Sequence, residues 1–451
     1  MRSRRLLTNK THADVRFILF SHVIHYQVRI ILVNYRYFIS GGPEKYLFNI
    51  KELLETNGHS VIPFSVQSKD NHASEYEGFF LKPVSKANET YFKEYNKFNP
   101  VTLWRGFTRM FYSFEARRKL DKLIKAVKPD LIYVLHYQNK ISASIFDAAK
   151  KNRIPVVHRV SDFGLICSNA LFYRPRQKDI CERCLGGSRL NAVVNKCVHD
   201  SYIYSSVKAG SLAFQKAIGT TGKIQAFVVP SRFTRDKLIE YGIPGSKLVH
   251  IPTFFNFRSN DQRSETEYRP FALYVGRIEP EKGLMTLVRA FENTGFNLKI
   301  IGFSSSGFEE QVKDYLRNKQ HHVEFLGKKS FEGIKPYLNT CAFTIVPSEC
   351  YDNFPNSVLE SFAFRKCVVA TNTGSLKEVV LNRETGLLFD LKNVADLRNK
   401  IEYLFANTEL CREMGENAFR RLQNEYSAEK HYCSLINLFG QVVAQHKHVL
   451  N

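Results

Sequence analysis

The chain has 451 residues, of which 44% are hydrophobic and 24% are charged. This length is too great for one ordinary hydrophobic core, and the composition is that of folded proteins in water, so we expect two or three globular domains. No apolar run reaches the ~18 residues that span a bilayer, and the N-terminus lacks the pattern of a secretory signal peptide. These features argue against an integral membrane protein and against secretion, and they predict a cytoplasmic location.

The chain is strongly basic. Lysine and arginine number 65 against 43 aspartates and glutamates, a formal net charge of +22. Such a charge suits nucleic acid, an anionic membrane surface or an acidic small substrate. Residues 1–27 are predicted to form a basic N-terminal extension, and a basic cluster with helical spacing lies between Arg117 and Lys128. Peripheral contact with the inner face of an anionic cytoplasmic membrane is a second interpretation, and only the charge favours it.

A βαβ unit is expected after the extension. Residues 30–33 predict a buried strand, the glycine pair Gly41 and Gly42 follows, and a helix over about 45–57 precedes a strand at 61–64. Glycines at this turn let the backbone approach a ligand closely, and the helix start can hold a negative charge. Many such turns, however, carry glycine only in order to turn. Further expected elements are strands at 129–134, 155–157 and 226–229 and helices at 114–127 and 142–151.

A second alternation of strands and helices follows a domain junction, which is predicted at the polar residues 256–269. The sequence therefore predicts an α/β protein of two doubly wound, Rossmann-like domains facing across a cleft. The last residues are predicted to form a helix that packs back on the first domain. The expected strands of the second half are 271–275, 298–301, 322–326, 342–346 and 367–370. The predicted domains are 28–258 with an insertion at 163–200, 259–430, and the helix 431–451.

The most informative stretch is Pro347–Ser361, which lies between a predicted strand and a predicted helix. Asn356 or Ser357 is expected to cap this helix and to leave backbone N–H groups facing an anion. Asp352 lies on the loop, and Glu360 falls about one turn into the helix. Two carboxylates flanking an anion-binding helix start suit a phosphate that carries sugar hydroxyls. The alternative is that both are solvated charges of an ordinary loop.

Two cations follow the first strand of the second half. Arg277 and Lys282 stand in a glycine-bounded loop, where a guanidinium and an ammonium would meet a diphosphate. Taken alone, both could be ordinary surface cations. Together with the stretch at Pro347–Ser361, the pattern is far more specific.

At these residues the chain resembles the retaining, nucleotide-sugar-dependent glycosyltransferases of the GT-B fold, family 4 (group 1). The resemblance covers roughly residues 30–440 and is strongest over 271–390. The motifs that carry it are Gly41 to Glu44, Val275 to Arg277 with Glu281 to Gly283, Pro347 to Ser361, Thr373 to Ser375 with Glu378, and Thr385 to Phe389.

The resemblance implies a role for each matching residue. Arg277 and Lys282 would hold the donor diphosphate and stabilise the departing charge, and Asp352 would act at the donor sugar, where the family usually has Glu. Glu360 would accept hydrogen bonds from the ribose hydroxyls. The catalytic prediction is Arg277, Lys282 and Asp352. The donor-binding prediction is Gly41, Gly42, Gly276, Phe354, Pro355, Asn356, Ser357 and Glu360.

The chain departs from the family pattern after the strand at 155–157. The family commonly has a His-Asp pair there, with the His near the reacting carbon, whereas Ser161 and Asp162 stand in this chain. His158 is three residues early and would point elsewhere along an extended segment. The leaving phosphate can itself take the acceptor proton, so Ser161 and Asp162 are predicted to line the site.

Four cysteines have the spacing of zinc ligands. Cys181 and Cys184 form a Cys-x-x-Cys pair between Cys167 and Cys197, and His199 is a spare ligand. The residues leave open a structural zinc and free thiols, and favour a disulfide less.

The function implied is a metal-independent, hexosyltransferase-like enzyme of cell-surface polysaccharide synthesis. Its partners would be a UDP- or GDP-sugar donor and a glycan or lipid-linked acceptor, with no nucleic acid and no catalytic cofactor. The acceptor side would be built by residues 67–98 and 167–197. Two alternatives stay open: a GT-B scaffold with impaired catalysis, and a basic zinc-containing nucleic-acid-binding protein, which the cysteine spacing disfavours.

Overall fold

The computed structural model describes residues 27–84, 100–256 and 268–450. The expected extension at 1–27, all but its last residue, lies outside these ranges. So do residues 257–267 of the expected junction and residues 85–98 of the expected acceptor-side segment.

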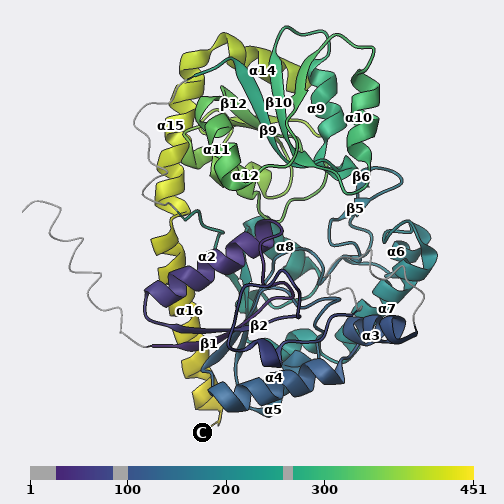
Figure 1. Ribbon diagram of the computed structural model, residues 1–451, viewed down its shortest axis with the longest axis vertical. Coiled ribbons are helices and arrows are strands. Elements are labelled where there is room, and N and C mark those ends of the chain that lie inside the picture. The colour runs from purple at the N-terminus through teal and green to yellow at the C-terminus, as the bar shows by residue number, and fades with distance from the viewer. Residues whose placement is uncertain (1–26, 85–99, 257–267, 451) are drawn as a thin grey trace, which may run out of the picture.

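Two parallel six-stranded sheets form the cores of two domains, one above the other in Figure 1. The second sheet has the strand order 3-2-1-4-5-6 of a doubly wound dinucleotide-binding fold. In spatial order, the first sheet contains β2 (Ser60–Phe64), β1 (Arg29–Val33), β3 (Leu131–Val134), β4 (Val156–Arg159), β7 (Ala226–Val229) and β8 (Leu248–His250). The second contains β11 (His322–Phe325), β10 (Asn297–Phe303), β9 (Phe271–Arg277), β12 (Phe343–Val346), β13 (Val368–Thr371) and β14 (Gly386–Phe389).

Helices cover the faces of both sheets. The first domain has α2 (Gly42–Thr56), α3 (Pro100–Met110), α4 (Phe114–Val127), α5 (Ile145–Lys151), α6 (Leu190–Val194), α7 (Tyr202–Ala217) and α8 (Arg232–Glu240), with a small hairpin of β5 (Tyr173–Arg174) and β6 (Asp179–Ile180). The second has α9 (Leu284–Phe291), α10 (Phe308–Leu316), α11 (Phe331–Thr340), α12 (Asn356–Ala363), α13 (Leu376–Val379), α14 (Val394–Ala406) and α15 (Thr408–Glu425), and α16 (Ala428–Leu450) ends the chain.

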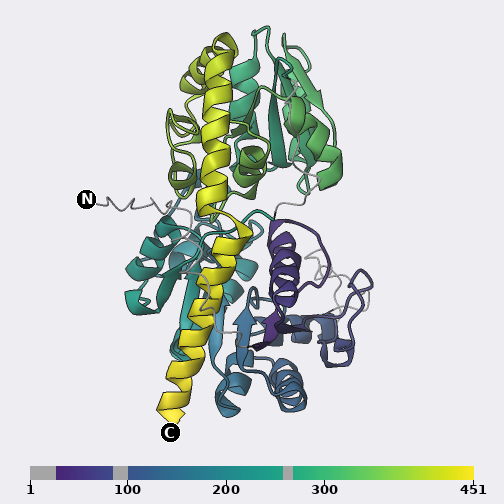
Figure 2. The same ribbon diagram turned by 90° about the vertical axis from the view of Figure 1, so that its left-hand side faces the viewer.

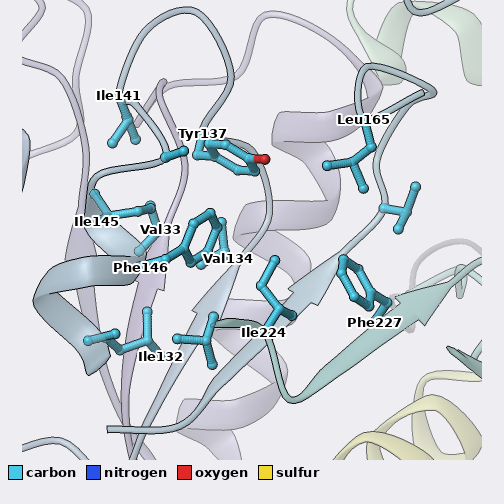
Figure 3. Close-up of a cluster of buried hydrophobic side chains, with 14 of the residues drawn as sticks. Val33, Ile132, Val134, Tyr137, Ile141, Ile145, Phe146, Leu165, Ile224 and Phe227 are labelled. Carbon is cyan, nitrogen blue, oxygen red and sulfur yellow. The ribbon is translucent and has the colours of Figure 1, made fainter. Parts of the chain in front are cut away.

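The central strands are continuous apolar runs because helices bury both of their faces. All four residues of β3, β4, β7, β12 and β13 are buried. Figure 3 shows one side of the first core, where Val33 and Val134 of neighbouring strands lie near Phe146 of α5, and Phe227 of β7 extends the same cluster. The fold prediction of two doubly wound α/β domains is confirmed.

Several elements escaped prediction, among them helices α3 and α7, the β5–β6 hairpin and the two edge strands β8 and β14. The edge strands β8 and β14 are short, and β8 is only partly buried, so its run carries a weak apolar signal. The cap expected for α12 is wrong. Pro355 occupies the capping position in an extended conformation, Asn356 is already helical, and the helix has no side-chain capping hydrogen bond.

The C-terminal helices join the domains. Figure 2 shows α15 and α16 running along the length of the molecule from the second domain to the first. Leu435, Leu438 and Phe439 of α16 are buried with β1 and α2 in the first domain's core. Beside this crossing, the Phe255 N–H donates to the Tyr426 carbonyl over 3.0 Å. Within the described part of the chain, no helix is long and apolar enough to cross a membrane.

Two buried histidines tie these elements together in their neutral form. His431 of α16 donates from Nδ1 to the Pro252 carbonyl (2.7 Å), and its Nε2 lies 2.9 Å from the Tyr46 hydroxyl. His158 of β4 donates from Nδ1 to the Val134 carbonyl (2.9 Å). Burial lowers the pKa of His431 to about 3 and that of His158 to about 4.

We therefore expect the free energy of unfolding to fall as the pH drops below the unfolded-state pKa of about 6.5. The unfolded chain then binds protons that the folded chain does not, and each histidine should cost about 2 kcal/mol between pH 6.5 and pH 5. Urea unfolding across this range measures the slope. His431→Asn should reduce the slope, whereas the exposed His322→Asn should leave it as in wild type. A flat profile in wild type would contradict the buried neutral state.

Candidate functional site

The site lies between the carboxyl edges of the two sheets, at the point in each sheet where the strand order reverses. In the second sheet this point lies between β9 and β12, and in the first it lies between β1 and β3. The loops that follow the two neighbouring strands at such a point run in opposite directions, and a crevice for a ligand opens between them. Arg277 is the last residue of β9 rather than part of the expected loop, because the strand runs two residues further than predicted. Lys282 follows β9, Asp352 follows β12, and Gly41 and Gly42 follow β1.

Lys282 is the central cation of the second domain's half. It ends the 3₁₀ turn η6 (Pro280–Lys282), and its Nζ pairs with an Asp352 carboxylate oxygen. Burial opposes the charge on Lys282, but Asp352 outweighs it, so the pKa of Lys282 is raised and the ammonium stays charged. Arg277 is half-exposed, and its Nη2 lies 3.1 Å from Glu281. Both cations are therefore charged, and each is held by one carboxylate.

The two loops touch through Gly283. This residue has φ +70°, and a Cβ built on it would lie 1.8 Å from the Pro347 carbonyl oxygen. Only glycine allows this approach, because any side chain would meet backbone. The contact therefore keeps the turn that carries Lys282 close to the loop that carries Asp352.

The Lys282–Asp352 pair lies within the second domain, whereas another ion pair crosses the cleft. The Glu360 carboxylate of α12 accepts a hydrogen bond from Lys45 Nζ of α2 over 2.8 Å, and Glu360 is 9% exposed. Beside this pair, a Cβ on Gly42 would lie 2.7 Å from Asn356 Nδ2. The glycine turn of the first domain thus closes against the start of α12, and its lack of a side chain allows the approach.

A cavity of about 550 Å³ lies at this crossing. Its wall combines Gly41, Gly42 and Lys45 with Asn356 and Glu360, and three lysines add to it: Lys328, Lys329 and Lys335. A larger hollow of about 1180 Å³ lies at Phe271, Asn297 and His322, where β9, β10 and β11 begin. That hollow is at the amino edge, whereas open α/β sheets bind ligands at the carboxyl edge. The smaller, basic cavity is therefore the better candidate for the ligand. Its wall contains the predicted residues Gly41, Gly42, Asn356 and Glu360, whereas Arg277, Lys282 and Asp352 lie outside it, at the same edge of the second sheet.

Direct hydrogen bonds hold the domains together beside the site. Asn353 donates from Nδ2 to the Val160 carbonyl (2.8 Å) and accepts from the Thr234 hydroxyl (2.7 Å). The Glu378 carboxylate accepts the Arg232 N–H over 2.9 Å and also the Phe233 N–H, so it caps α8 from the other domain. The described conformation is therefore one in which the cleft is bridged.

The first domain contributes Ser161 and Asp162, and also His136, which was not predicted from the sequence. Ser161 donates to the Leu135 carbonyl (2.8 Å), so its hydroxyl is already occupied. The Asp162 carboxylate lies 3.7 Å from His136 Nε2. Burial lowers the pKa of His136, and Asp162 opposes that shift. His136 could have been found, since it follows a predicted strand and belongs at the same carboxyl edge.

A buried lysine lies behind this pair. Lys208 of α7 donates to Asn139 Oδ1 over 2.7 Å. Burial lowers its pKa to about 8, although the Asp162 charge acts in the opposite direction. The Asp162 charge thus acts on two basic groups, His136 and Lys208.

The remaining predicted residues fall at the same edge. Gly276 lies near the end of β9, with the Tyr274 ring beside it, and Phe354 packs near Tyr426 with ring centres 5.8 Å apart. Ser357 lies in the first turn of α12, after Pro355 and Asn356.

The four candidate zinc ligands fall within the insertion around the β5–β6 hairpin and α6. None forms a disulfide. Burial, with the nearby thiols adding to it, raises the pKa of Cys184 to about 11 and that of Cys197 to about 12. Among the residues that the structure describes, no three His, Cys, Asp or Glu side chains are grouped to hold a metal ion. The zinc therefore stays a prediction for Cys167, Cys181, Cys184 and Cys197.

Two family models match adjoining parts of the chain. Glycosyltransferase Family 4 matches residues 40–258, and Glycosyl transferases group 1 matches residues 256–421. Together they cover both domains and the cleft.

Individual proteins resemble the chain over different lengths. An uncharacterized glycosyltransferase of Methanocaldococcus jannaschii is 34% identical over 168 residues, which is 37% of this chain and 46% of that protein, so the match spans under half of that relative. The capsular polysaccharide biosynthesis glycosyltransferase CapM of Staphylococcus aureus is 24% identical over 363 residues, 74% of this chain and 93% of that protein. In structure, Anabaena Alr3699/HepE in complex with UDP and glucose superposes with a TM-score of 0.58 at 16% identity, covering 92% of this chain and 100% of that one.

Proposed function

The chain belongs to the GT-B glycosyltransferases of family 4 (glycosyl transferases group 1), and on that premise we propose which transfer it catalyses. It moves a hexose from a UDP- or GDP-sugar to a glycan or lipid-linked acceptor, with retention of anomeric configuration, in cell-surface polysaccharide synthesis. CapM, a relative along 93% of its length, is named for capsular polysaccharide biosynthesis, and the HepE structure contains UDP and glucose.

One observation carries the proposal. At the carboxyl edge of the second sheet, Lys282 pairs with Asp352 and Arg277 with Glu281. On α12 of the same domain, Glu360 pairs with Lys45 of the facing domain, whose Gly42 closes against Asn356. Arg277 and Lys282 are proposed to bind the diphosphate, for which Arg offers a bidentate fork and Lys a point charge. Glu360, one turn into α12, is proposed to accept hydrogen bonds from the ribose hydroxyls with the carboxylate that Lys45 contacts in the described conformation.

In the proposed reaction the bond between the sugar C1 and the β-phosphate oxygen breaks, and the acceptor oxygen bonds to C1 on the same face. The acceptor proton passes to a phosphate oxygen of the leaving nucleotide. Negative charge builds on that phosphate, so Lys282 and Arg277 act where charge develops. These protein cations are proposed to supply the positive charge, which makes a catalytic metal unnecessary. Asp352 holds the Lys282 ammonium at the sugar end, and Asp162 with His136 lines the acceptor side.

The test is transfer itself. Purified protein is incubated with UDP- or GDP-hexoses and a lipid-linked or oligosaccharide acceptor, and the product linkage is read by NMR. An anomeric configuration equal to that of the donor is expected. An inverted product would contradict the retaining mechanism, and donor binding without turnover would favour a scaffold with impaired catalysis.

Glu360→Gln should weaken donor binding by about 10- to 100-fold, because a neutral amide cannot replace hydrogen bonds worth about 1.5–3 kcal/mol to a charged acceptor. Titration calorimetry with the nucleoside diphosphate measures the change. Glu55→Gln, at the exposed Lys51–Glu55 pair of α2, is the control and should bind as wild type. Equal affinity in Glu360→Gln and wild type would exclude Glu360 as the ribose ligand.

A further inference from the structure

Helix α3 is built with its polar side inward. Its buried positions are Thr102, Gly106 and Arg109, one helical face, and the exposed ones are apolar. The sole tryptophan of the chain, Trp104, is 67% exposed. Arg109 is held inside by Glu115 (2.9 Å) and by the Lys82 carbonyl (3.1 Å). A surface helix of a folded domain normally buries its apolar stripe, so this face is made for contact with something else. The apolar side chains that α3 exposes are Val101, Leu103, Trp104 and Phe107.

Further exposed apolar side chains lie on α7, which is next to α3 in Figure 1, and on α6, which contacts α7. The rings of Phe107 and Phe111 stack with centres 4.5 Å apart, and Phe111 lies 5.8 Å from Phe214 of α7. Among the described residues, ten of fourteen exposed large hydrophobic side chains fall within 101–114 and 190–204. We call this surface the α3–α7 patch. Its further members are Phe114, Leu190, Val194, Tyr202, Ile203 and Tyr204.

The charges on and beside these helices are mainly positive, and the acid directly before α7, Asp200, is paired with Arg176. The sequences of α3, α6 and α7 contain no aspartate or glutamate. The helix that follows α3 directly, α4, exposes Arg118, Lys122 and Lys125. Its two acids are already paired, Glu115 with Arg109 and Asp121 with Lys125. A second copy of this chain is a poor occupant, because two molecules of charge +22 repel.

We propose that the α3–α7 patch docks the first domain on an anionic lipid bilayer. Aromatic and aliphatic side chains bury at the acyl boundary, and basic side chains meet the negatively charged headgroups. The patch would lie on the bilayer surface without crossing it. None of its residues lines the donor cavity. The docking proposal does not depend on which sugar the enzyme transfers.

Trp104 gives a direct probe, since no other tryptophan contributes to emission. Full-length protein is mixed with vesicles of phosphatidylglycerol and phosphatidylcholine in equal parts, or of phosphatidylcholine alone. We expect the Trp104 emission to shift to the blue and to be quenched by bromine-labelled lipid only with the anionic vesicles. Raised salt should weaken the binding, since it screens the attraction.

Variants keep the inference falsifiable in a sedimentation assay. Leu103→Ser with Phe107→Ser should weaken vesicle binding by at least about tenfold. Tyr403→Ser, an exposed aromatic of α14 in the other domain, should bind as wild type. Three results would overturn the proposal. They are no vesicle binding, wild-type binding by the double variant, and a Trp104 emission already blue without lipid, which would mean that another part of the chain or a second copy covers the patch.

Discussion

Lys282→Ala should lower kcat about 10²- to 10³-fold, the usual cost of removing one group that stabilises charge developing in a transition state. The structure gives the reason: the ammonium is largely buried at the switch point and stays charged beside Asp352. Initial rates of nucleotide release with saturating donor and acceptor measure the effect.

Removing Lys282 also leaves Asp352 without its partner, so lost folding needs to be separated from lost chemistry. Lys282→Arg keeps a charge but changes its shape and should recover part of the rate. Lys51→Ala, at an exposed pair on α2, is the neutral control. If Lys282→Ala turned over within tenfold of wild type while melting normally, Lys282 would not be the phosphate-stabilising group.

Gly283→Ala should destabilise the protein by at least about 3 kcal/mol. An alanine in the left-handed region costs about 1–2 kcal/mol by itself. At this position its Cβ would also lie 1.8 Å from the Pro347 carbonyl, a backbone atom that can yield only if the loop moves. Because that loop carries Asp352, donor binding should be lost as well.

The second domain offers a matched control. Gly307 stands before α10 with φ +79°, and a Cβ at this position would have no neighbouring atom within 4 Å. Gly307→Ala therefore carries the conformational cost without the collision, and should lose only about 1–2 kcal/mol. Urea unfolding of both variants measures the difference, and equal losses would show that the Gly283–Pro347 contact is not needed.

The parts of the site that the sequence predicts are local. Arg277 ends a strand, Lys282 and Asp352 each follow a strand within a few residues, and parallel strands bring such positions to one edge. The α12 helix start was predicted for the same reason, although its cap was not. Pro355 adopts the extended conformation that a capping residue needs, and Asn356 faces Gly42 instead.

The rest depends on contacts that the sequence does not display. Lys45 and Glu360 are 315 residues apart, and only the packing of the two domains joins them. His136 approaches Asp162 because β3 and β4 are neighbours in the sheet. Helix α3 has apolar residues at helical spacing, which would normally face the core. It instead buries Thr102, Gly106 and Arg109, so the spacing does not show which face points inward.

The central claim is that the cleft binds a nucleotide sugar through Lys282 and Glu360. The most direct measurement is a thermal-shift panel of UDP-, GDP-, ADP- and CMP-sugars on wild type, Lys282→Ala and Lys51→Ala. A ligand that binds only the folded state raises the melting temperature with its concentration. We expect a shift with the UDP- or GDP-sugars that Lys282→Ala removes and Lys51→Ala keeps. No shift with any donor, or an undiminished shift in Lys282→Ala, would contradict the claim.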